Sequence, residues 1–173
     1  MSFRRPNLQA ALAVMSPDIA QALREGSRFL RERGIAHALC GGIAVSAYAR
    51  PRATKDVDFL VGEDAYEHHG AIVVPKAPSR VGAVAVDSVP LEPELHALAD
   101  VLASPEIVDG IPIVSAQALI AMKLVAGRMQ DQADVVALLE SGAVDVDECR
   151  GWLQARGFDI AGFDHLVQKA RGS

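Results

Sequence analysis

Two aspartates, Asp56 and Asp58, interrupt an otherwise apolar segment that runs from residue 55 to Val61. Residues i and i+2 of a strand point to the same side, so the two carboxylates lie close enough to share a ligand. Two buried carboxylates repel each other and lose hydration unless a cation compensates them. Mg²⁺ supplies that charge and prefers a few carboxylates together with phosphate oxygens of a substrate. The pair therefore predicts a site for Mg²⁺ or Mn²⁺.

A glycine pair, Gly41-Gly42, lies shortly before these aspartates. Residues 36–40 are apolar and predict a strand, and residues 43–50 predict a helix that Pro51 ends. A strand that turns into a helix at two glycines exposes backbone amides at the positive end of the helix dipole, where phosphate binds readily. Carboxylates that bind metal beside such amides indicate phosphoryl or nucleotidyl transfer.

The alternative interpretation of Asp56 and Asp58 is an edge strand that carries two solvated acids. The apolar run Phe59-Leu60-Val61 argues against it. Arg52 and Lys55 lie beside the aspartates in sequence, and we expect them either to pair with these carboxylates or to attract an anionic ligand.

The spacing of these residues resembles the signature of the nucleotidyltransferase superfamily, a hydrophobic-Gly-[Gly/Ser] element followed by Asp-x-[Asp/Glu]. In this chain thirteen residues separate Gly42 from Asp56. A second segment, LIAMKLVAGRMQDQADVVALL, resembles the downstream helix pair of the AbiEii-type toxins. The resemblance covers residues 35–142, and the charged residues of its second segment are Lys123, Arg128, Asp131 and Asp134.

The resemblance implies an α/β fold with a small mixed β-sheet flanked by helices and a C-terminal helical portion. It also implies roles for individual residues. Metal ions would be held by Asp56, Asp58 and a third carboxylate from a neighbouring strand. The triphosphate would contact Gly41, Gly42 and Ser46, and Lys123 would neutralise phosphate charge or touch the nucleotide.

Asp87 is the candidate for the third carboxylate. The segment AVAVDSV (83–89) alternates like a strand, with Val84 and Val86 on one side and Asp87 on the side of two alanines, where small side chains leave room for a ligand. The alternative is a residue at a strand end that caps the turn before Pro90. Asp131 and Asp134 have a similar alternative, because they could simply brace helices or form ion pairs such as Arg128 with Asp131.

The resemblance further implies transfer of an NMP group from an NTP to a hydroxyl of RNA (such as a tRNA end), a protein or a small molecule. The AbiEii-type proteins that this chain resembles are toxins of toxin–antitoxin systems, so the resemblance also implies an antitoxin as a partner. A second hypothesis is a catalytically inactive domain of the same fold that binds a nucleotide or a partner. It is favoured by the interval from Gly62 to Asp87, whose 26 residues are fewer than the helix and strand of relatives need.

Length and composition bound the rest. The chain has 173 residues, half of them apolar, which suits a single domain: a helical segment (1–34), a nucleotidyltransferase-like core (35–114) and a helical portion (115–173). Its apolar runs end well before the ~20 residues of a membrane span. Cys40 and Cys149 have no metal-ligand spacing, so we expect buried thiols of a cytoplasmic protein.

Charge is unevenly distributed along the chain. Residues 1–60 contain nine Lys/Arg and five Asp/Glu, a net charge of +4, whereas residues 61–173 contain eight and seventeen, a net charge of −9. The overall charge of −5 argues against indiscriminate binding to nucleic acid.

The remaining segments give weaker signals. We expect a helix over 62–70 and a short strand over 71–74, then a helix over 92–103. Residues 106–114 predict a hairpin with its turn at Asp109-Gly110. Ser115 predicts the start of an apolar helix, and three more helices follow it.

Overall fold

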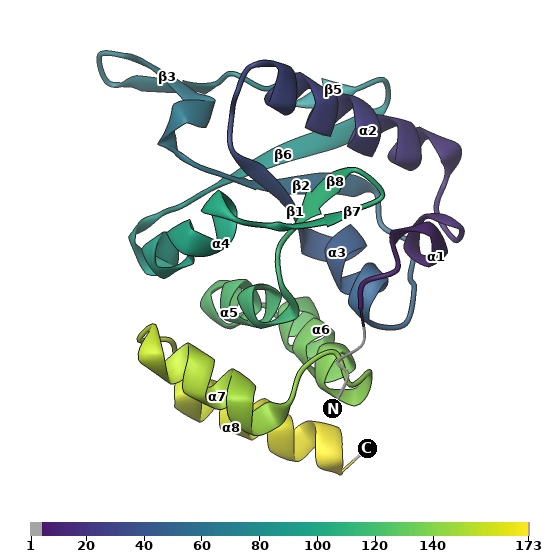
Figure 1. The fold of residues 1–173 in the computed structure, drawn as a ribbon, viewed down its shortest axis with the longest axis vertical. Helices are drawn as coiled ribbons and strands as arrows, with labels where there is room; N and C mark the ends of the chain where they lie inside the picture. The colour runs from purple at the N-terminus through teal and green to yellow at the C-terminus, as the bar shows by residue number, and fades with distance from the viewer. Residues whose placement is uncertain (1–4, 173) are drawn as a thin grey trace.

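The computed structural model of the chain describes residues 5–172, which build a mixed six-stranded β-sheet with helices on both of its faces (Figure 1). The strand order is β5-β6-β2-β1-β8-β7. These strands are β1 (His37–Cys40), β2 (Asp56–Val61), β5 (Arg80–Val81), β6 (Val84–Pro90), β7 (Glu106–Val108) and β8 (Ile111–Ile113). The predicted α/β class, with a small mixed sheet flanked by helices, is confirmed.

Strand β2 lies in the interior of the sheet, between an antiparallel neighbour and a parallel one. Its antiparallel partner is β1, where Cys40 lies opposite Asp58. Its parallel partner is β6, where Asp58 lies opposite Asp87. Register partners on neighbouring parallel strands are about 4.8 Å apart and project from the same face of the sheet. The two aspartates are therefore immediate neighbours although 28 residues separate them in the chain.

Helix α2 (Pro17–Glu32) covers one face of the sheet, against β2, β5 and β6 (Figure 1). Phe59 of β2 reaches this helix at Gly26, where an added Cβ would lie 3.0 Å from the phenyl ring. Helices α3 (Gly41–Tyr48) and α5 (Ala116–Ala126) lie on the opposite face, the one to which Asp58 points. The other helices are α1 (Leu8–Leu12), α4 (Ala99–Ala103), α6 (Met129–Glu140), α7 (Val146–Ala155) and α8 (Ile160–Arg171).

The C-terminal portion is helical, as predicted. Helices α7 and α8 pack on α5 and α6, on the side away from the sheet (Figure 1). Buried apolar side chains form one core cluster that extends from Leu8 to Val167. Both cysteines are buried free thiols. No helix within residues 5–172 is long and apolar enough to cross a membrane. Of the expected N-terminal segment, residues 1–4 lie outside the described part.

Two local predictions, the turn between β7 and β8 and the cap at the start of α5, are confirmed. The β7–β8 turn places both Asp109 (φ 50°) and Gly110 (φ 78°) in the left-handed region, as the tightest hairpin turns require. Ser115 caps α5, and its Oγ accepts a hydrogen bond of 3.2 Å from the amide of Ala118.

The prediction of a helix over 62–70 is wrong. A 3₁₀ turn, η1 (Glu63–Ala65), leads into β3 (Tyr66–His69), which forms a separate two-stranded sheet with β4 (Ile72–Pro75). The expected helix over 92–103 also divides, into the 3₁₀ segment η2 (Pro93–Leu98) and α4. The β3–β4 hairpin projects from the body of the molecule, so neither of its faces carries the alternation of a half-buried strand (Figure 1).

Candidate nucleotide and metal site

The β1–α3 turn brings backbone and carboxylate into direct contact. Gly41 has a φ of +63°, and a Cβ added there would lie 1.9 Å from Oδ2 of Asp58. Only glycine can occupy this position, both for its backbone conformation and for the space that the carboxylate takes. The amide of Gly42 faces the carboxylate of Asp58 and favours its charged form. The start of α3 therefore presents its positive end to an anionic group of the protein itself.

Among the three candidate metal ligands, Asp58 has a raised pKa. Burial and, after it, the negative charges of Asp87 and Asp56 raise its pKa to about 6, although Lys123 and the Gly42 amide oppose the increase. The side chains of Asp56 and Asp87 are exposed and border the same cavity as Asp58. The structure thus brings together the three carboxylates expected from the sequence.

The three carboxylates do not form a finished metal cage. Within residues 5–172, no group of three or more His, Cys, Asp or Glu side chains already has the geometry to hold a metal ion. Mg²⁺, however, usually binds through one or two carboxylates, with substrate phosphates and water completing its octahedron. The hard oxygen ligands and the repulsion felt by Asp58 fit such an ion.

A buried network of charges faces these carboxylates from α5 and α6. Nζ of Lys123 lies 2.7 Å from Oδ1 of Asp131 and 3.0 Å from Oδ2 of Asp134. Both aspartates are almost fully buried, with 1% and 2% of their surfaces exposed. Burial lowers the pKa of Lys123, but the hydrogen bonds and charges of the two aspartates outweigh it and raise the pKa overall. Lys123 is therefore a permanent cation.

Two arginines complete this network. Arg128 donates from Nε to Oδ2 of Asp131 at 2.7 Å, and 76% of its side chain is exposed. Arg52 donates from Nη2 to both oxygens of Asp134, at 3.0 and 3.1 Å. The expectation that Arg52 pairs with the neighbouring aspartates is therefore wrong, because its partner lies on α6. Three cations and two buried aspartates leave one excess positive charge at this wall.

Ser46 does not join the site. It is buried in α3, outside the cavity lining, and its hydroxyl donates to the carbonyl of Arg52 at 3.2 Å and accepts from the Arg52 amide at 3.3 Å. The prediction that Ser46 contacts the triphosphate is corrected accordingly. Its hydroxyl instead holds the backbone of Arg52, whose side chain Asp134 fixes.

These groups surround one cavity of about 690 Å³, within the range of small-molecule sites. Of the predicted residues, the cavity wall includes Gly41, Gly42, Asp56, Asp58, Asp87 and Lys123. No local sequence pattern pointed to two polar residues of the wall, Thr54 and Gln130. Gln130 donates to Oδ1 of Asp134 at 3.0 Å, and the side chain of Thr54 lies against Gly42.

No protein-family model matches this chain, and no curated protein matches it significantly. The chemistry of the cavity is therefore inferred from its own residues.

Proposed function

We propose that this chain is a metal-dependent nucleotidyltransferase that transfers an NMP group from an NTP to an acceptor hydroxyl. The observation that supports this most strongly is the register of β2 and β6. It makes Asp58 and Asp87 neighbours on one wall of a cavity whose other wall carries Lys123 and Arg128. Adjacent carboxylates and a cationic wall are together what a metal-bound triphosphate requires.

In this proposal Asp56, Asp58 and Asp87 hold Mg²⁺ or Mn²⁺. The bound ion would withdraw charge from the phosphate oxygens and stabilise the leaving pyrophosphate. Asp58 is the central ligand, because it lies between the glycine turn and Asp87 and has the raised pKa of a carboxylate without its counter-ion.

The triphosphate would lie against the cationic wall. Arg128 is the most available cation, since most of its side chain is exposed and it borders the cavity. Lys123 would act on the triphosphate through its charge and not through a direct contact, because its ammonium group already forms ion pairs with Asp131 and Asp134. Charge neutralisation by fixed cations in a partly dry cavity stabilises developing negative charge better than solvent does.

The proposed reaction is a displacement at the α-phosphorus. The acceptor oxygen forms a bond to that phosphorus, the bond from it to the β-bridging oxygen breaks, and pyrophosphate leaves. The proton of the acceptor hydroxyl passes to the carboxylate of Asp87, which is exposed at the cavity edge.

Label transfer tests this proposal. The purified protein is incubated with each α-³²P-labelled NTP, with Mg²⁺ or Mn²⁺, and with separate RNA, protein and small-molecule fractions of a cell extract. Transfer of α-label, with none from γ-labelled NTP and none by Asp58→Asn, is the expected result. Transfer of γ-label would indicate a kinase instead, and metal-independent transfer would contradict the role of the carboxylates.

A second candidate is a domain that binds a nucleotide or a partner without turnover. The contacts that favour it are internal: the Gly42 amide already faces Asp58, and two aspartates already form ion pairs with Lys123. NTP binding by the wild-type protein without label transfer to any fraction would support this candidate.

A further inference from the structure

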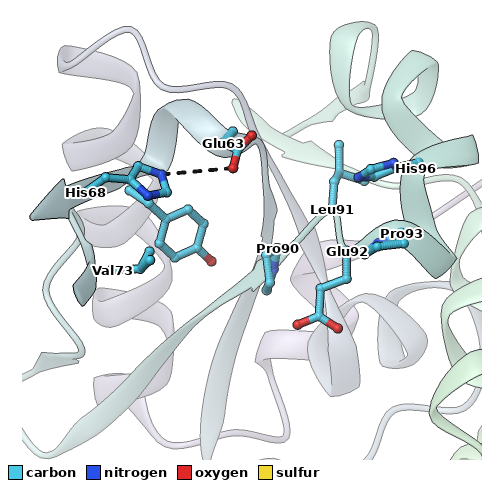
Figure 2. A pocket seen from close by; sticks show the side chains of 9 residues that line it. Glu63, His68, Val73, Pro90, Leu91, Glu92, Pro93 and His96 are labelled. Atoms are coloured by element: carbon cyan, nitrogen blue, oxygen red, sulfur yellow. Dashed lines mark ion pairs between the residues drawn. The ribbon is translucent and has the colours of Figure 1, made fainter. Parts of the chain in front are cut away.

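A second cavity, of about 570 Å³, shares a lining residue with the proposed nucleotide site. Figure 2 shows the side chains that line it. One side of it comes from η1 and the β3–β4 hairpin, with Glu63, His68 and Val73. The other side comes from the end of β6, with Pro90, and from the chain that follows it, with Leu91 and Glu92 (Figure 2). Glu92 lines both cavities, so the two are direct neighbours.

Strand β6 leads from one cavity to the other. Asp87 and Val89, which point to one face of the strand, line the first cavity. Pro90, the last residue of β6, and Leu91, just after it, line the second. At about 3.3 Å per residue, the second cavity begins about 10 Å beyond Asp87. A molecule held there can present a group to the carboxylate of Asp87.

The walls of the second cavity are apolar and acidic. Tyr66 is fixed by a hydrogen bond of 3.2 Å from its hydroxyl to the carbonyl of Ser88, so its ring is a rigid wall. The charged residues of the lining are Glu63 and Glu92, and neither Lys nor Arg is among the lining residues. Burial and the charge of Glu92 raise the pKa of Tyr66. The negative charge of Glu92 therefore reaches the Tyr66 hydroxyl on the other side of the cavity.

The two cavities therefore differ in the ligands that they can accept. The first has fixed cations beside its carboxylates, whereas the second has carboxylates with two imidazoles, His68 and His96. His68 lies 4.0 Å from Glu63, a contact that is an ion pair only when the imidazole is protonated. Phosphate groups of a nucleic acid are repelled by such a lining, and a positive charge is attracted.

We propose that the second cavity binds the acceptor, and that this acceptor is a hydroxyl compound with an apolar or aromatic body and an amine or guanidinium group. Glu63 and Glu92 receive the positive charge, and the Tyr66 ring stacks on the body or on the cation. The assignment of the ligand as an acceptor rests on the proposed function, whereas the preference for a cation does not.

Two probes with the same hydroxyphenyl body and opposite charge test the cavity without any nucleotide. These are tyramine and 3-(4-hydroxyphenyl)propionate, titrated into the full-length protein at a pH of about 8, where an ordinary imidazole is neutral. Ring signals of His68 and His96 in carbon–proton NMR spectra report the binding. We expect tyramine to shift both signals, and the anionic probe to bind at least about tenfold more weakly.

Three variants that each remove one negative charge show which residues attract tyramine. Glu92→Gln and Glu63→Gln are each expected to weaken tyramine roughly threefold to tenfold. Glu67→Gln is the control, because Glu67 lies next to His68 on β3 but outside the cavity lining and is exposed. An equal loss in Glu67→Gln would mean that general surface charge, and not the cavity, attracts the probe, and would overturn the proposal.

Other outcomes also overturn it. Equal or tighter binding of the anionic probe would refute the preference for a cation, as would the absence of tyramine binding at millimolar concentration. A short RNA oligonucleotide that shifts the His68 and His96 signals would assign the cavity to nucleic acid. Tyramine binding in a protein that fails every label-transfer assay would refute the transferase and leave the class of ligand intact.

Discussion

The carboxylate of Asp58 lies so close to Gly41 that a Cβ at residue 41 would be 1.9 Å from its Oδ2. The turn that begins α3 and the central acid of the proposed metal site are thus built as one unit. A change at Gly41 displaces Asp58, and any displacement of Asp58 alters its position relative to Asp87.

Gly41→Ala tests this coupling. Alanine in the left-handed region costs about 1–2 kcal/mol, and the contact with Asp58 adds to that cost. Gly142→Ala is the matched control, because Gly142 also has a positive φ (+71°) but has no atom within 4 Å of an added Cβ. In urea denaturation Gly41→Ala should lose at least about 1 kcal/mol more than Gly142→Ala. Equal losses would show that Asp58 yields freely to a side chain.

Asp58→Asn should stabilise the protein when a chelator is present. The pKa of Asp58 rises from its ordinary value to about 6 on folding, so the folded state binds its proton more tightly than the unfolded state does. Its contribution to stability is complete below pH ~4 and is lost as the pH rises through about 6. Above that pH the variant should gain up to about 3 kcal/mol over wild type.

The same measurement at low pH is the check on this explanation. The difference between Asp58→Asn and wild type should shrink as the pH falls from about 6 to about 4, because protonation then neutralises the wild-type carboxyl. Asp56→Asn should give a smaller effect, since Asp56 is exposed. A variant that is less stable than wild type at neutral pH without metal would mean that the attraction between the Gly42 amide and the Asp58 carboxylate outweighs the repulsion.

Lys123→Met should lower the free energy of unfolding strongly. The fraction of the protein that stays folded should lose less free energy of NTP binding than the protein loses in stability. The substitution leaves two buried aspartates with less compensation, a change that costs about 3–5 kcal/mol for a fully buried pair. Arg128→Met is the contrast, because this side chain is mostly exposed and its ion pair contributes about 1 kcal/mol or less. Thermal unfolding and NTP titration separate the two. Wild-type stability in Lys123→Met would refute the role of Lys123 in compensating the charges of the two buried aspartates.

Much of this site follows from local sequence patterns, because its elements are local. The glycine turn, β2 with its two aspartates and the Ser115 cap each depend on residues within a few positions of one another. The adjacency of Asp58 and Asp87 does not, since it depends on a crossover that places β6 beside β2. The resemblance to a known family anticipated it, and the alternation of 83–89 was consistent with it.

Other features depend on packing that no local pattern shows. Arg52 pairs with Asp134, 82 positions away, although two aspartates are much nearer to it in sequence. Ser46 points into the loop at Arg52 and away from the cavity because of its position on the buried face of α3. The β3–β4 hairpin exposes Ile72 and Val73, so its apolar residues give a misleading signal of burial.

Asp87→Asn tests the proposed chemical step. Asparagine keeps the shape of the side chain and removes its charge, so the protein should fold while NMP transfer falls by ~10²-fold or more. Affinity for the metal–NTP complex should fall less, because Asp56 and Asp58 remain. Rapid-quench measurement of a single turnover separates the two effects. Full activity in Asp87→Asn would assign the acid to another residue, such as Glu92 of the cavity wall.

The measurement that tests the central claim most directly is the binding of Mn²⁺ by electron paramagnetic resonance, with a non-hydrolysable NTP analogue present. It needs no knowledge of the acceptor. We expect the wild-type protein to bind the Mn²⁺–nucleotide complex, and both Asp58→Asn and Asp87→Asn to bind it at least about tenfold more weakly, while the remote Asp109→Asn is unchanged. Equal binding by wild type, Asp58→Asn and Asp87→Asn would contradict a metal site at these two aspartates, and with it the proposed nucleotidyltransferase.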